Sequence, residues 1–347
     1  MFYRSIAFLL MSITTLYSGE RILGVGAATI DLLIPVDDQF LLSHFPEMKG
    51  GSNGFDLEMI ERILLESNTP AKIVVGGSAA NTVRALTRMG EMCAFYTHIG
   101  MDEYGERFSH HMRSLGIEER FNRSPDFATS RVLCLITPDG QRTFIAYDQR
   151  ITDSTLCNED FHNLKWVHIE ARQLKSGISV EKVMHMSREN GAKVSLDLSN
   201  FELARDFKDV LLHLIPNYVE IVFCNEDEIT ALTGLSPEEG CLELQKLCPV
   251  VVVTKGPNGC LVGHANTLLA IPTFPATPID TTGAGDLFAS GFLYGYLRGY
   301  PLATCAQIGN RLGSAVVEVI GAELPEEQWE KIHTFMVSLE QSYPLHE

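Results

Sequence analysis

The sequence predicts an α/β fold with a doubly wound, mainly parallel sheet, and two observations carry that prediction. From Lys165 onward, short apolar segments alternate with segments of helical spacing, which is the pattern of βαβ units. Glycines and polar residues stand where the expected strands end and the expected helices begin, and ligands bind at such positions in open α/β sheets. A chain of 347 residues is long enough to bury a large core.

The expected elements follow from apolar spacing and from turn residues. Residues 21–36 are rich in Ile, Leu and Val without helical spacing, so they indicate a strand, a turn and a second extended piece. The turn Pro138-Asp139-Gly140 predicts a hairpin between residues 132–137 and 142–147. A loop is expected at 49–54, and further strands are expected at 73–77, 93–99, 166–169, 193–198, 221–225 and 249–253. Helices are expected at 56–66, 78–89, 106–115, 180–190, 287–297, 302–320 and 326–339, and one more helix is expected to end at 214.

Composition and charge exclude several classes of partner. The chain is 45% hydrophobic and 20% charged, which is ordinary for a globular protein. A formal net charge of −17 argues against nucleic acid or an anionic membrane as the partner, and an anionic ligand must be held by local donors and metal. The eight cysteines are scattered without a C-x-x-C pair, which favours a reducing, cytoplasmic location.

Residues 1–20 are interpreted as an extension of a domain that covers residues 21–340. Residues 1–18 carry one charge, Arg4, and an apolar run, so they resemble a short signal peptide. The small-residue cleavage pattern is poor, however, and the run is too short to predict a membrane span. The preferred interpretation is an over-long gene start, with translation beginning at Met11; otherwise the segment is a loosely packed arm.

Residues 279–291 read I-D-T-T-G-A-G-D-L-F-A-S-G and are the main candidate for a catalytic site. Gly283, Ala284 and Gly285 carry no side chain larger than a methyl group, so their N–H groups can approach an anion at the start of the following helix. Asp286 would repel that anion, unless it accepts a proton from a hydroxyl about to attack a phosphate. An ordinary N-cap aspartate is the alternative, and it leaves the glycines unexplained.

Two further clusters follow expected strands near the N-terminus. Gly76-Gly77 lets the backbone approach a ligand, and Asn81, one turn into the next helix, can both donate and accept hydrogen bonds. A tight strand–helix turn is the alternative interpretation. Asp31 stands between apolar residues, where a lone carboxylate is costly unless it is hydrogen-bonded.

The segment 280–286 resembles D-T-x-G-A-G-D, the second signature of the ribokinase-like (PfkB) family of sugar and nucleoside kinases. With G-G-S-A-A-N-T at 76–82, the chain looks closest to the adenosine-kinase-like branch, and the resemblance covers about residues 21–325. It implies a kinase that uses ATP and Mg²⁺, with Asp286 as the base and the glycine turn as the anion hole. It also implies a small β-strand lid from about residues 32–55 and 122–150, and substrate contacts from Asp31, Gly76, Gly77, Asn81 and a phosphate-facing Arg142.

Later strand ends supply the residues expected near nucleotide and metal. Asn225 and Glu228 share a helix face and can order water around Mg²⁺, which resembles the family's N-x-x-E motif; a plain acidic first turn is the alternative. By the same resemblance, Asp280 belongs to a monovalent-cation loop, so K⁺ is a further expected ion. The nucleotide-binding candidates are Asn225, Thr254, Gly256, Gly259 and Asn310.

Other interpretations of the sequence are weaker. Gly24-x-Gly26 lacks the third glycine of a dinucleotide fingerprint, which disfavours an oxidoreductase, and the absence of G-x-x-x-x-G-K-[ST] excludes a P-loop NTPase. Asp102 is expected to be structural, because aspartate is common before a helix start. The expected substrate is an adenosine-like ribonucleoside, ribose or another sugar, phosphorylated on a primary hydroxymethyl group by a monomer or homodimer. The alternative function is a non-catalytic nucleoside- or sugar-binding protein on the same scaffold.

Overall fold

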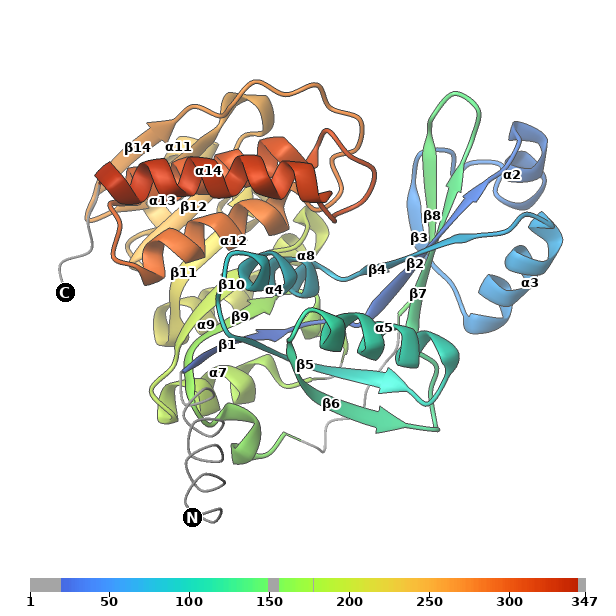
Figure 1. The fold of residues 1–347 in the computed structure, drawn as a ribbon, viewed down its shortest axis with the longest axis horizontal. Coiled ribbons are helices and arrows are strands. Elements are labelled where there is room, and N and C mark those ends of the chain that lie inside the picture. Colours follow the sequence, from blue (N-terminus) through green and yellow to red (C-terminus); the bar gives the residue numbers. More distant parts are fainter. Residues whose placement is uncertain (1–19, 149–155, 177, 343–347) are drawn as a thin grey trace, which may run out of the picture.

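The computed structural model describes residues 20–148, 156–176 and 178–342, and within these ranges it contains two β-sheets (Figure 1). The larger sheet has nine strands, which are parallel from β12 to β6 and antiparallel at the β13 and β14 edge. Their order is β14 (Thr267–Ile271), β13 (Cys260–His264), β12 (Val250–Thr254), β11 (Val219–Asn225), β10 (Lys193–Asp197), β9 (Leu164–Glu170), β1 (Arg21–Val25), β5 (Cys93–Gly100) and β6 (Glu118–Ser124).

Helices cover both faces of the larger sheet, because its strands alternate their side chains between two cores. On β1, Ile22 joins one core and Leu23 joins the other. The first core includes α4 (Ser78–Arg88), α5 (Glu103–Ser114), α12 (Ala284–Leu297), α13 (Leu302–Val316) and α14 (Glu326–Ser342). The second includes α7 (Val180–Glu189), α8 (Phe201–Asp206), α9 (Lys208–Tyr218), α10 (Glu226–Thr233), α11 (Pro237–Leu244) and the short η1 (Asn158–Phe161). Two further short helices are α6 (Gln173–Ser176) and η2 (Gly256–Asn258).

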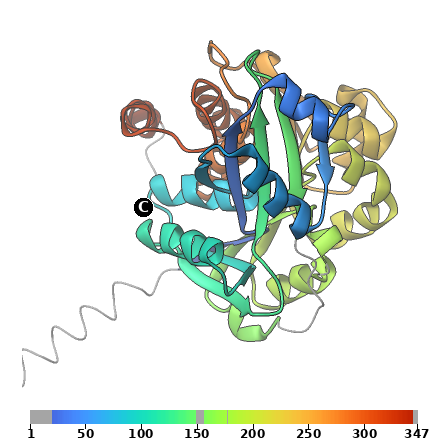
Figure 2. The same cartoon turned by 90° about the vertical axis from the view of Figure 1, so that its right-hand side faces the viewer.

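The smaller sheet stands beside the larger one and forms the lid. Its strands are β3 (Ser52–Gly54), β8 (Arg142–Tyr147), β7 (Ser130–Ile136), β2 (Thr29–Pro35) and β4 (Lys72–Gly76), in that order. Helices α2 (Asp38–His44) and α3 (Leu57–Ser67) lie on the side away from the larger sheet, in front of the strands in Figure 2. The doubly wound sheet with a smaller β-sheet is therefore confirmed as the fold class.

The two faces of the lid differ in their partners. On the outer face, Ile30, Leu32 and Ile34 of β2 are almost completely buried, in the core that includes residues of α2 and α3. Asp31 and the residues that alternate with this buried set form the inner face, which is turned toward the larger sheet. Half-buried apolar side chains on the inner face are Leu33, Val74, Val132, Ile136 and Phe144.

Most predicted elements are confirmed, and the differences concern polar or ambiguous segments. Residues 52–54 form the edge strand β3 instead of a loop, and the polar edge strand β6 was not predicted. Helix α13 ends at Val316, because the chain turns before Gly321. Strand β4 pairs antiparallel with β2, so the lid draws on residues outside 32–55 and 122–150. Residues 122–124 belong to the larger sheet, whereas 149–150 and the extension 1–19 lie outside the described residues.

No helix in the described part of the chain is both long enough and apolar enough to cross a membrane.

Because the two faces of the lid differ in burial, truncating neighbouring side chains on them should lower the free energy of unfolding by different amounts. Leu133→Ala removes a fully buried side chain from the outer core and should lower the free energy of unfolding by about 2–5 kcal/mol. Val132→Ala, one residue earlier on the half-buried inner face, should cost less than about 1 kcal/mol. Chemical unfolding of both variants measures the difference; equal losses would contradict the assignment of the faces.

Candidate active site

The first turns of α4 and α12 lie against each other. Helix α12 follows Gly283 and carries Asp286 in its first turn, while α4 begins at Ser78, just after β4. The Ser78 hydroxyl donates to Asp286 Oδ1 at 2.7 Å, and Asn81 Nδ2 donates to Asp286 Oδ2 at 2.7 Å. The Thr82 hydroxyl donates to the Asp286 backbone carbonyl at 3.1 Å. One neighbouring helix therefore holds both oxygens of the expected base.

The surroundings of Asp286 make its carboxyl a weaker acid than usual. Burial raises the pKa to about 6, against the lowering effect of the hydrogen bonds from Ser78 and Asn81. The nearby carboxylate of Glu170 raises the pKa further, and the Arg84 guanidinium lowers it. A carboxylate with a pKa near 6 is ionised at neutral pH and still basic enough to accept a proton from an attacking hydroxyl.

Asp286 is not the N-cap of α12, so the alternative interpretation of this residue is wrong. The N-cap is Gly283, in the left-handed region at φ 78°, where a Cβ would lie 2.4 Å from a neighbouring methyl group. The Ala284 N–H donates to the Thr281 carbonyl at 3.2 Å. Among the described residues, the N–H groups of Gly283 and Gly285 have no acceptor, so the candidate anion hole consists of these two.

Asp31, Gly76 and Gly77 lie together where the lid joins the larger domain. A Cβ on Gly76 would come within 2.3 Å of Asp31 Oδ2, and one on Gly77, at φ 105°, within 2.3 Å of a backbone carbonyl oxygen. Burial raises the pKa of Asp31 to about 6, with Arg84 and Arg172 acting to lower it. No described residue donates a hydrogen bond to Asp31, so its carboxylate is free for a ligand's hydroxyl groups.

Arg142 connects the lid to the segment that precedes α12. Its Nη1 lies 2.5 Å from Asp280 Oδ1, and Asp280 also accepts from Thr282 and from the N–H of Gly321. Burial alone would raise the pKa of Asp280, but Arg142 and these donors hold it at about 2. The guanidinium thus supplies Asp280 with a positive charge, and the expected K⁺ site stays a prediction.

A pocket of about 550 Å³ opens beside the start of α12. It brings the expected nucleotide-binding residues of the β12–β13 turn together with Ala284 and Gly285 of the glycine turn. Its wall is largely apolar and includes Phe274, Pro275 and Phe288. The predicted residues that line it are Thr254, Gly256, Gly259, Ala284, Gly285 and Asn310.

Asn310 is more engaged with the protein than the sequence suggested. It is 4% exposed, and its Nδ2 donates to the carbonyls of Ile271 at 3.3 Å and Pro272 at 3.1 Å. The amide nitrogen thus fixes the chain at the end of β14, at the rim of the pocket. A direct contact between Asn310 and a purine stays a prediction.

Asn225 and Glu228 form a capping box at the start of α10. Asn225 Oδ1 accepts from the Glu228 N–H, and the two Glu228 oxygens accept from Asn225 N and Nδ2, all at 2.9 Å. The described residues contain no cluster of three or more metal-ligating acids, cysteines or histidines. Burial raises the pKa of Glu228 to about 7, and burial together with the Glu228 carboxylate raises the pKa of nearby Asp197. The Asn225 amide and the Glu228 carboxylate, which lie side by side, fit a hydrated Mg²⁺, because this ion keeps most of its waters and needs few protein ligands.

Four residues at the site had no role assigned from the sequence. Ser78 and Thr82 bond Asp286, and Arg84 donates to Asn81. Glu170 is buried and accepts from the backbone N–H of residues 27 and 79, so it ties the end of β1 to the start of α4. Ser78 stands inside the G-G-S-A-A-N-T motif, whereas Glu170 comes directly after the strand expected at 166–169 and has no motif of its own.

Asp102 has the structural role that was expected from the sequence. Its Oδ1 accepts from the Gly105 N–H at 2.7 Å and caps α5. The carboxylate also accepts from the Thr129 N–H at 2.9 Å and from Arg131 at 3.1 Å. Asp102 therefore fastens α5 to the beginning of β7.

Comparison with known proteins agrees with this site. The model of the pfkB family of carbohydrate kinases matches residues 58–329. An adenosine kinase from Saccharomyces cerevisiae is 25% identical over an alignment of 282 residues that covers 74% of this chain and 82% of that protein. A probable sugar kinase from Rhizobium etli superposes with a TM-score of 0.82 at 26% identity, covering 92% of this chain and 99% of the other. An adenosine kinase from Sinorhizobium meliloti gives a TM-score of 0.80 at 25% identity, covering 91% and 99%.

The chain therefore belongs to the PfkB family of carbohydrate kinases, phosphotransferases that use ATP and act on an alcohol group of a sugar or nucleoside.

Proposed function

We propose that this enzyme transfers the γ-phosphoryl group of ATP to a primary hydroxymethyl group of a ribonucleoside, with Asp286 as the general base. The main support for this proposal is the position of the Asp286 carboxylate. It is held by Ser78 and Asn81, three residues from an N-cap glycine and beside a pocket large enough for a nucleotide. A sugar such as ribose is the other substrate that this arrangement accommodates.

The reaction follows from the order of these groups. Asp286 takes the proton of the hydroxymethyl group, and the oxygen left behind forms a bond to the γ-phosphorus while the bond to ADP breaks. The N–H groups of Gly283 and Gly285 donate to the phosphoryl oxygens as charge develops. With its pKa of about 6, Asp286 then releases the proton to water at neutral pH.

Other residues hold the two substrates in place. Asp31, with no donor among the described residues, would accept hydrogen bonds from sugar hydroxyls, and Asn81 and Gly77 lie at the adjacent helix start. The triphosphate would lie along Thr254 and Gly256. When bound, Mg²⁺ would neutralise phosphate charge, with Asn225 and Glu228 holding its water shell.

The inner face of the lid favours a nucleoside over a free sugar. Its half-buried side chains include Leu33, Val132 and Phe144, on the same face as Asp31. A sugar held at Asp31 would leave these apolar groups exposed, whereas an attached base would cover them. A homodimer that joins through the lids would cover the same face. Binding and turnover of a nucleoside and of a free sugar therefore have to be compared directly.

We also propose that the enzyme works in the cytoplasm. ATP is available there, and all eight cysteines are free thiols, seven of them buried. This location suits an enzyme whose cysteines pack as small apolar side chains.

Asp286→Asn should abolish turnover while leaving ligand binding almost intact. The amide keeps the shape of the side chain but cannot accept the proton, so kcat should fall on the order of 10³-fold or more. The matched control is Asp56→Asn, because Asp56 caps α3 on the outer lid and asparagine caps equally well. Initial rates and calorimetric ATP binding measure both effects; near-normal turnover by Asp286→Asn would refute the mechanism.

The activity should decline below about pH 6. A base works only when deprotonated, and burial raises the pKa of Asp286 from its ordinary 3.8 to about 6, so protonation begins earlier than for an exposed aspartate. Asp31 titrates in the same range, so the acid limb of kcat/KM should be steeper than one ionisation gives. A limb centred near pH 4 in the pH–rate profile would contradict this assignment.

Phe144→Ala should raise the KM for adenosine about tenfold, because an aromatic contact with a base contributes roughly 1–3 kcal/mol. The KM for ribose, which lacks a base, should change little. Leu42→Ala is the control, since Leu42 is 55% exposed on α2, on the other side of the lid. An adenosine KM unchanged in Phe144→Ala, or ribose preferred by the wild-type enzyme, would exclude the nucleoside assignment.

A further inference from the structure

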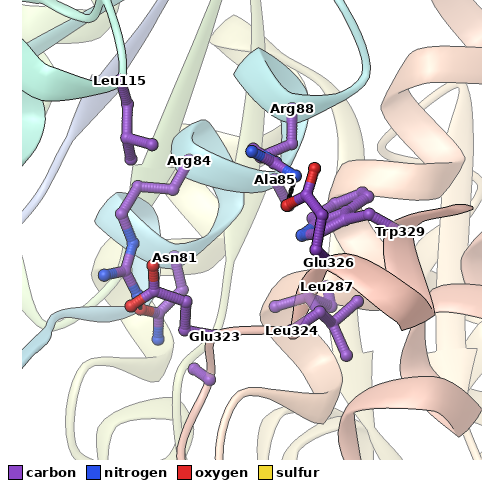
Figure 3. Close-up of a pocket in the computed structure, with 11 residues that line it drawn as sticks. Asn81, Arg84, Ala85, Arg88, Leu115, Leu287, Glu323, Leu324, Glu326 and Trp329 are labelled. Atoms are coloured by element: carbon purple, nitrogen blue, oxygen red, sulfur yellow. Dashed lines mark hydrogen bonds and ion pairs between the residues drawn. The ribbon is translucent and has the colours of Figure 1, made fainter.

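Arg84 lies one turn after Asn81 on α4, and its guanidinium is buried with 5% of the residue exposed. Its Nη2 donates to Asn81 Oδ1 at 2.5 Å, and its Nη1 donates to the Val75 carbonyl at 3.0 Å and lies 3.1 Å from His111 Nε2. Figure 3 shows Arg84 and Asn81 in a small pocket of about 90 Å³ that Glu323 also lines.

This contact determines which way the Asn81 amide faces. An asparagine amide has an accepting oxygen on one side and a donating nitrogen on the other. Because the guanidinium can only donate, it selects the oxygen and leaves the nitrogen toward Asp286 Oδ2. The reversed amide would place two donors against each other and an oxygen against the carboxylate. Arg84, Asn81 and Asp286 thus form a chain of hydrogen bonds with one consistent direction.

The charge of Arg84 also acts on both carboxylates of the site. Arg84 lowers the pKa of Asp286 and of Asp31, opposing the effect of burial on each. The carboxylate of Glu170 raises the pKa of Asp286. Asp286 in turn raises the pKa of Asp197 and of Glu228. Among the described residues, Arg84 is the cation with the largest effect on Asp286.

Arg84 is itself surrounded by groups that keep it charged. Burial lowers the pKa of Arg84, and Glu323, Asp286 and Asp31 oppose this effect, so the guanidinium stays charged at neutral pH. Burial lowers the pKa of His111, and Arg84 lowers it further, so the ring beside the guanidinium is neutral near pH 7. The guanidinium is therefore the positive centre among three carboxylates from three separate segments.

We propose that Arg84 is a positioning residue for phosphoryl transfer, which orients the Asn81 amide toward the base and keeps that base ionised. The inference rests on the proposed function, because it assigns Arg84 a part in the same reaction. A purely structural role is the competing explanation, since the bond to the Val75 carbonyl also fastens α4 to β4. The two explanations differ in what happens to the pH dependence of turnover.

The test compares Arg84→Met and Arg84→Lys with Arg88→Met. Arg88 is one turn further along α4 and lines the same pocket, but it pairs with Glu326 and lies over Trp329. Arg84→Met should lower kcat about tenfold or more and move the acid limb of kcat up by roughly one pH unit, because a nearby cation is lost. Arg88→Met should match the wild-type enzyme in both respects.

Arg84→Lys separates the charge from the geometry. Lysine keeps the positive charge, so the acid limb should stay at its wild-type position, but it lacks the planar fork and should not restore kcat. In an Asn81→Ala background at high pH, Arg84→Met should cause a smaller loss than in the wild-type background, because the two residues act in series.

The outcomes distinguish the inference from the function on which it rests. If Arg84→Met folds, as judged by its melting temperature, and keeps wild-type kcat and pH dependence, the inference is overturned. If Arg84→Met loses kcat but its acid limb does not shift, only a structural role is left for Arg84. If Arg84→Met does not fold, wild-type kcat in Arg84→Lys overturns the positioning role. Inactive wild-type enzyme, or active Asp286→Asn, refutes the proposed function itself.

Discussion

The contact between the first turns of α4 and α12 is the constraint on which the site depends. The first turn of α12 carries a carboxylate, and two side chains from the first turn of α4 donate hydrogen bonds to its two oxygens. Asp286 is thereby fixed by side chains from a distant part of the chain, 205 and 208 residues away. A base on a flexible loop could not be held at one distance from two substrates.

Local donors at this site stand against the acidic charge of the whole molecule. The chain carries a formal net charge of −17, yet it belongs to a family that uses an anionic nucleotide. Arg142 already pairs with Asp280 and Arg84 lies among three carboxylates, so the donors left at this point are the bare amides of Gly283 and Gly285. Donors placed in a water-poor cleft act more strongly than the same charges spread over the surface. An anionic ligand of this protein therefore depends on local donors and on a bound metal ion, because the field of the whole chain repels it.

Much of the fold could be predicted from the sequence, because its buried strands are continuous apolar runs and its helices begin and end at clear capping residues. Strand β12 and the box at Asn225 are examples. Strands β3 and β6 escaped prediction because β3 has only three residues and β6 is polar, and each is identified as a strand by the neighbour with which it pairs. The sheet to which β4 belongs was equally hidden, since periodicity does not tell which partner a strand has.

The site was predictable where a motif exists and hidden where the contact is between distant segments. The glycine turn and Asp286 stand in one short stretch, whereas Arg84 and Glu170 are ordinary charged residues until the fold brings them together. The interpretation of Asp286 as an N-cap failed because Gly283 can occupy that position with positive φ. Asn310 lines the predicted pocket, but its hydrogen bonds to backbone carbonyls could not be foreseen from spacing.

Strand β4 has a consequence for how the enzyme moves. It is the lid strand that continues through Gly76 and Gly77 directly into α4, the helix that holds the base. A swing of the lid about this pair of glycines would act on the same helix whose side chains bind Asp286. The angle of the lid and the setting of Asp286 are thus mechanically coupled through two residues of backbone.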